Sequence, residues 1–158
     1  KKTQHEADTL AGTWILAYLQ PGPNGAGIDR RIPFPDFDFN DNYQIFSFPA
    51  EGDPGRVTNI GQLLGPLVNV QVSGTVQQAM QATDQEFTSS SFPFIPGQRF
   101  EAYIQGGKIC FSSTSDNCWV DLPMIQGKGL FDSLYVGDRL RIGQNLNGGG
   151  ARVVQIRL

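Results

Sequence analysis

The chain has 158 residues, with 12 Lys and Arg against 15 Asp and Glu and a formal net charge of −3. This length fits one domain that buries about 70% of its unfolded surface. The charge balance gives no basic footprint for nucleic acid, and no apolar run reaches the ~18 residues of a membrane-spanning helix. The 19 Gly, 10 Pro and 11 Phe favour an all-β fold with long Pro/Gly-rich loops.

The amino-terminal part divides into an arm, a strand and a loop. Residues 1–9 are mostly polar and are predicted to form a flexible arm, which leaves 10–158 as the domain. Residues 10–19 are apolar on both alternations, as expected of a strand that is buried on both sides or crosses a core. Residues 20–27 contain repeated Pro and Gly and cannot form regular structure. The start at Lys1-Lys2, without Met, is compatible with a targeting peptide that has been removed.

Phe34, Phe37 and Phe39 stand among prolines and acids in residues 33–40. Burying one Phe contributes about 1.5–3 kcal/mol, so three rings in one short segment are costly to leave in water. They either pack beneath their own loop, as satellite apolar clusters commonly do, or form an exposed docking surface. Both interpretations stay open.

The middle of the chain reads as a series of short strands. Val68, Val70, Val72 and Val76 alternate with polar residues, which indicates a half-buried strand, and Gly74 within it indicates a bulge or bend. Gly106-Gly107 is predicted to be a hairpin turn. The predicted strands are 43–48, 56–63, 68–76, 86–92, 99–104, 108–112 and 118–122, and 77–85 has weak helical character. Many short strands separated by turns imply a sandwich or a closed barrel.

Residues 129–158 are predicted to form a closing β-hairpin. Leu140 and Ile142 alternate with Arg139 and Arg141, and this period of two residues indicates a strand with one solvent-exposed face. A second β-branched run follows at 153–156. The loop between them, 144–150, contains three consecutive glycines that permit the positive φ of a reversal.

Cys110 and Cys118 are placed symmetrically about Thr114. A hairpin centred there would put them directly opposite one another, close enough for a disulfide. The alternative is a pair of small buried thiols, which is usual for free cysteine.

The residues that could carry catalysis are few. His5, the only histidine, lies in the predicted arm, where no third group would hold it for nucleophilic catalysis. One histidine and two cysteines do not suit a structural zinc site. Fifteen acids scattered over loops are typical of solvation. We therefore expect neither an enzyme nor a metal site.

Two motifs carry a resemblance. Residues 132–142, DSLYVGDRLRI, resemble the carboxyl-terminal motif of the plastid lipid-associated (PAP/fibrillin) family, D-x-x-Y-L-D/G-D-x-L-R-I. Residues 10–18, LAGTWILAY, look like the opening strand of that family, L-x-G-x-W-x-L-x-Y. The motifs stand in the family's order and bracket almost the whole chain. Because the closing motif keeps acids and a base together, Arg141 is expected to pair with Asp132 or Asp138.

The resemblance implies one antiparallel, lipocalin-like β-barrel in which 10–19 and 151–158 are neighbouring strands. A barrel of eight strands is filled by its own side chains or holds one small apolar ligand. The candidate inward-facing residues of a ligand site are Trp14, Tyr18, Phe46, Val70, Phe100, Phe111 and Tyr135.

The resemblance also implies a function and a location. The chain would be a non-enzymatic, peripheral plastid protein that binds lipid, carotenoid or another pigment such as chlorophyll at thylakoid or plastoglobule surfaces. Its partners would be membrane lipids or plastoglobules, without nucleic acid or an obligatory cofactor. In this setting a Cys110–Cys118 disulfide suits an oxidising compartment such as the thylakoid lumen.

Departures from the family pattern leave a second function open. Gln144 stands where the family has a basic residue, the loop 144–150 is expanded, and residues 20–40 look like an insertion. Long loops on a small barrel suggest a binding surface. The chain would then be a structural or docking subunit of a photosynthetic membrane complex, with residues 33–40 and 144–150 in contact and the barrel only a scaffold.

Overall fold

The computed structural model describes residues 9–22, 41–49, 54–63, 67–79, 98–111, 117–146 and 150–158. Within these ranges, nine strands form one antiparallel sheet: β1 (Gly12–Gln20), β2 (Asn42–Ser47), β3 (Gly55–Gln62), β4 (Val68–Gln78), β5 (Gln98–Phe111), β6 (Cys118–Leu122), β7 (Gly127–Val136), β8 (Leu140–Asn145) and β9 (Arg152–Arg157). The all-β prediction is confirmed. The described residues contain no helix of the length and apolarity that crossing a membrane requires.

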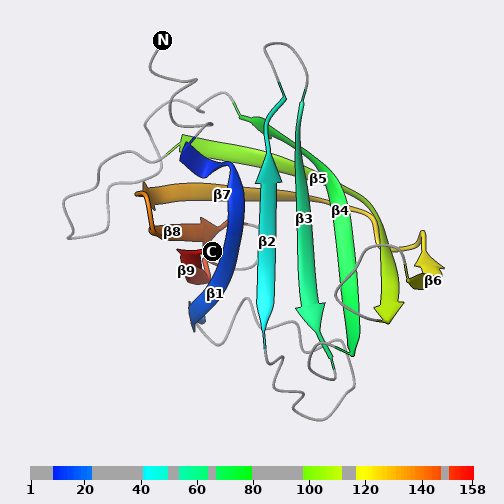
Figure 1. Ribbon diagram of the computed structural model, residues 1–158. Coiled ribbons are helices and arrows are strands. Elements are labelled where there is room, and N and C mark those ends of the chain that lie inside the picture. The colour runs from blue at the N-terminus through cyan, green and yellow to red at the C-terminus, as the bar shows by residue number, and fades with distance from the viewer. Residues whose placement is uncertain are drawn as a thin grey trace.

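The sheet closes on itself. Its strand order is β4-β3-β2-β1-β9-β8-β7-β5, and β4 also pairs with β5, so eight strands form a ring (Figure 1). The predicted neighbourhood of the first and last strands is confirmed, because β1 and β9 pair antiparallel. Closure satisfies the backbone groups that an open sheet would leave at its edges. Strand β6 adds to β5 outside the ring.

Strand β5 corrects a prediction, because Gly106 and Gly107 do not form a hairpin turn. β5 continues through both glycines and pairs with β4 from Phe100 to Phe111. Neither glycine has the positive φ that a tight turn needs. Gly107 instead permits close packing, since an added Cβ would lie 3.1 Å from Ile125 Cδ1. The predicted bulge at Gly74 is confirmed by a register shift between Ser73 and Gly74.

Strand β7 was not anticipated as a strand. Two of its first three residues are Gly127 and Gly129, which weaken any alternation signal, and its register against β8 shifts between Ser133 and Tyr135. The structure pairs β7 with β5, where Phe131 lies opposite Phe100.

A compact apolar core fills part of the ring. Its fully buried members are Leu10, Trp14, Phe46, Val57, Val76, Phe100 and Ala102. Trp14 is held on both sides. Its Nε1 donates to the carbonyl of Leu10 at 2.9 Å, and the Arg157 guanidinium lies 4.4 Å from its ring. Arg157 also donates to the carbonyl oxygens of Thr9 and Ala11, which fastens the last strand to the beginning of the first.

The bulge provides a test of the fold. An added Cβ at Gly74 would lie 1.9 Å from the carbonyl oxygen of Tyr103, whereas Gly106, opposite Ser73 in the same region, has open space. We expect Gly74→Ala to lower the free energy of unfolding by about 3 kcal/mol, because backbone must move to accept the methyl group. Gly106→Ala is the control and should change it by less than about 0.5 kcal/mol. Urea denaturation of both variants measures the difference, and equal losses would contradict the register at the bulge.

Candidate functional site

Register identifies the face of the sheet that lines the ring. Residues directly opposite one another in neighbouring strands share a face. Phe46 lies opposite Val57, and both are in the core, so this pair faces inward. Two residues along the same strands, Gln44 lies opposite Asn59, and Asn59 lies opposite Val72. This second row therefore also faces the interior.

A guanidinium group lies within this interior. Arg141 on β8 is only 2% exposed and lies opposite Gln155 of β9. Its Nη1 donates to Gln44 Oε1 at 2.6 Å and to Gln155 Oε1 at 2.7 Å. Its Cζ lies 4.7 Å from the ring centre of Phe46 and 5.2 Å from that of Phe131. Arg141 thus joins three strands around a polar centre enclosed by aromatic rings.

The cation of Arg141 is poorly compensated. Its Nε has no hydrogen-bond partner, and no carboxylate among the described residues forms a salt bridge with the side chain. Burial lowers the pKa of Arg141 to about 9, since a low-dielectric surrounding disfavours the charged form. The group is still a cation at neutral pH. Buried cations normally have an anionic partner, because desolvation costs several kcal/mol per ion.

The expected pairing of Arg141 with Asp132 or Asp138 is wrong. Asp132 instead binds Arg99 through two contacts, Nε–Oδ1 at 2.8 Å and Nη2–Oδ2 at 3.1 Å. Asp138 is exposed. The reason is strand parity: Asp132 alternates with the inward-facing Phe131 and therefore lies on the other face from Arg141.

A second part of the inward face is apolar and only partly covered. The register extends the Val72 row to Val70 on β4 and Ile109 on β5, which lie opposite each other. These three side chains are half-buried, whereas the core residues Val57 and Phe100 are fully buried. Accessible apolar side chains on the inside of a closed ring are what a bound apolar molecule would contact.

The predicted inward residues divide into two groups. Trp14, Phe46 and Phe100 are buried in the core and Val70 is half-buried. The prediction that Tyr18 and Tyr135 face inward is wrong, because their side chains are 60% and 51% exposed. Each tyrosine follows a register shift in its strand, and one slipped position turns a side chain to the opposite face.

Phe111 lies opposite Val68, on the same face as Val70 and Ile109, but at the end of β5 its side chain is exposed and the ring of strands does not enclose it. Its ring lies 5.5 Å from that of Trp119, which is 78% exposed. Val120 and Leu67 are exposed close by, since Val120 pairs with β5 and Leu67 precedes β4 beside Phe111. We call Leu67, Phe111, Trp119 and Val120 the hairpin patch.

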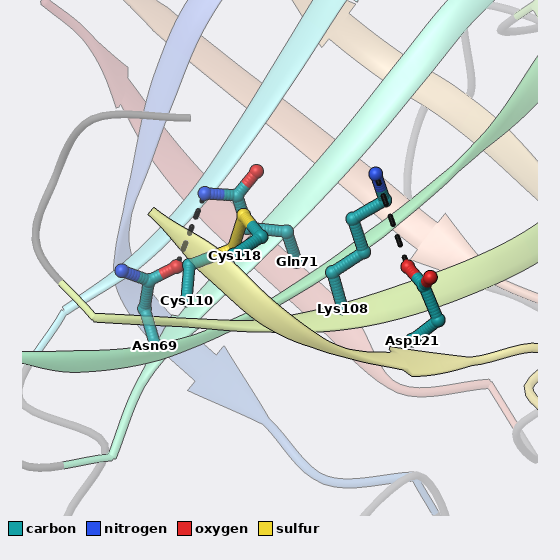
Figure 2. The surroundings of a disulfide bond; sticks show 6 residues. All are labelled: Asn69, Gln71, Lys108, Cys110, Cys118 and Asp121. Atoms are coloured by element: carbon teal, nitrogen blue, oxygen red, sulfur yellow. Dashed lines mark hydrogen bonds and ion pairs between the residues drawn. A yellow bond between two sulfur atoms is a disulfide. The ribbon is translucent and has the colours of Figure 1, made fainter. Parts of the chain in front are cut away.

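The predicted disulfide is confirmed: Cys110 and Cys118 are bonded, with an S–S distance of 1.99 Å. Figure 2 shows the bond linking β5 to β6, with the Lys108–Asp121 ion pair farther along the same two strands. A bridge over so short a loop contributes roughly 2–3 kcal/mol in the chain-entropy model. It therefore stabilises the part of β5 that carries the hairpin patch.

A cluster of titratable side chains occupies the outer face of β5 and β7. Glu101 accepts from Tyr103 at 2.5 Å and forms an ion pair with Lys128. These contacts lower the pKa of Glu101, through Lys128 first, and the bond to Glu101 raises the pKa of both Tyr103 and Lys128. All three shifts move away from neutrality, whereas acid–base catalysis needs a pKa near the working pH. This cluster is a solvated surface network.

Several residues and segments for which the sequence makes a prediction lie outside the described residues. They include Phe34, Phe37 and Phe39, most of the arm 1–9, the predicted strand 86–92 and residues 147–149 of the last loop. Within the described ranges, no three His, Cys, Asp or Glu side chains are grouped as they would be to hold a metal ion.

Gln44 and Gln155 were missed as site residues, although each interrupts apolar neighbours at an inward position of its strand.

Comparisons of the chain with protein-family models, curated proteins and solved structures give no match.

Proposed function

We propose that the chain is a non-enzymatic lipid-associated protein of the plastid, similar to PAP/fibrillin proteins, with a lipocalin-type barrel that holds one apolar ligand. The observation that carries this proposal is the inward apolar surface formed by Val70, Val72 and Ile109, which the core leaves partly uncovered. The closed ring supports it, because a ring of eight strands is wide enough for one small ligand. The bracketing sequence motifs supply the plastid and thylakoid context.

An uncharged fluorescent probe tests the proposal. We expect N-phenyl-1-naphthylamine to bind the protein saturably at one site, and Val72→Phe to weaken this binding at least about tenfold by filling the space inside the ring. Ser73→Phe is the matched control, because Ser73 is the next residue, faces outward and is exposed. If both variants bind the probe like the parent protein, the ligand does not enter the ring.

The second candidate function is a docking subunit of a photosynthetic membrane complex, for which the barrel is only a scaffold. The hairpin patch favours it, since clustered exposed apolar residues mark interaction surfaces. In that case Trp119→Ser should release the protein from thylakoid membranes without weakening probe binding. Val72→Phe and Trp119→Ser therefore distinguish the two functions, because the first should affect probe binding and the second membrane association.

A further inference from the structure

The buried guanidinium of Arg141 narrows the class of ligand. A cation taken out of water is strongly unfavourable when no carboxylate pairs with it, and none does among the residues that the structure describes. Two neutral amide oxygens and two ring faces offset this cost only in part. A structural role would be served as well by an apolar side chain in such an aromatic surrounding. The cation is therefore better explained by a negative charge that arrives with the ligand.

The surroundings of the guanidinium are suited to an incoming anion. Its Nε lacks a partner, so one donor is free for an acceptor. Two residues along β8, Gly143 places no side chain inside the ring, and an added Cβ there would lie 3.3 Å from Val153 Cγ2 and 3.4 Å from Arg141 Nη2. Gln44 connects the guanidinium to the apolar inward surface. Its side-chain amide accepts a hydrogen bond from Arg141 and donates one to Asn59 Oδ1. Asn59 in turn lies opposite Val72, which belongs to the apolar inward surface. The polar centre and the apolar surface are thus contiguous.

We propose that the ligand is a long-chain carboxylic acid whose carboxylate binds Arg141 while its hydrocarbon chain contacts Val70, Val72 and Ile109. This inference rests on the proposed function and specifies its ligand. One guanidinium carries one positive charge, which a carboxylate neutralises, whereas a phosphate monoester with a charge of about −1.5 to −2 would leave net negative charge inside the ring. An uncharged carotenoid would leave the cation unpaired.

The test compares cis-parinaric acid with its methyl ester, which has the same fluorescent chain but no charge. We expect the protein to bind the acid about 10- to 100-fold more tightly than the ester, the range for a hydrogen bond to a charged group. Arg141→Met should abolish this preference and leave ester affinity within about threefold. Arg141→Lys should keep part of the preference, because it keeps the charge.

Arg139→Met is the control, since it removes an exposed arginine from the same β8 region and should leave the preference unchanged. Equal binding of acid and ester by the parent protein would overturn the inference and leave the proposed function standing. Binding of neither would overturn both. The comparison on the parent protein needs no variant, so it decides the matter even if Arg141→Met does not fold.

Discussion

Trp14→Ala is expected to lower the free energy of unfolding by about 3–5 kcal/mol, a large part of the stability of a domain this size. Trp14 is fully buried, so the change leaves a cavity. It also removes the bond from Trp14 Nε1 to the Leu10 carbonyl and leaves the Arg157 guanidinium without the ring on which it packs. Urea denaturation followed by circular dichroism measures the loss.

Tyr18→Ala is the control for this change. Tyr18 belongs to the same strand and has a similar aromatic side chain, but a register shift turns it outward. We expect a loss below about 1 kcal/mol, as for most surface substitutions. Equal losses at the two positions would contradict the assignment of Trp14 to the interior and Tyr18 to the outer face.

The affinity for a long-chain acid is expected to depend on pH in a way set by Arg141. Burial lowers the pKa of this group to about 9 in the empty protein. Between about pH 5 and pH 9 both the carboxylate of the ligand and the guanidinium of Arg141 are charged, so the affinity should be constant. Above this range the empty protein loses the proton that binding requires, and the affinity should fall up to tenfold per pH unit.

Among the described residues, the side chains that contact Arg141 do not titrate in this range. They are Gln44 and Phe46 from β2, Phe131 from β7 and Gln155 from β9. Fluorescence titrations with cis-parinaric acid between pH 5 and pH 10.5 measure the profile, and the methyl ester should show no such fall. A loss of acid affinity between pH 6 and pH 8 would point to a different titrating group.

Much of the sheet can be predicted from the sequence because alternation is a local property. The valines of β4 and the two runs of the closing hairpin were identified in this way, and the disulfide followed from symmetric spacing. The continuity of β5 could not be predicted. Two adjacent glycines resemble a turn, and only the length of β4 beside them shows that the strand continues.

The candidate site was harder to predict because it depends on parity and on distant partners. Register shifts at Leu16/Tyr18 and Ser133/Tyr135 turned both tyrosines outward, and no local pattern reveals such shifts. Arg141 was singled out with the wrong partners. Its true partner Gln44 is 97 residues away, whereas Asp138 is close in sequence but on the surface.

Methyl-selective NMR during titration with palmitic acid tests most directly whether the ligand lies inside the ring. We expect saturable chemical-shift changes at Val70, Val72 and Ile109, which face inward. We expect none at Ile142 of β8 and Ile156 of β9, which both lie on the outer face of the sheet. Changes confined to Leu67 and Val120 of the hairpin patch, or no change at any methyl group, would contradict binding within the ring.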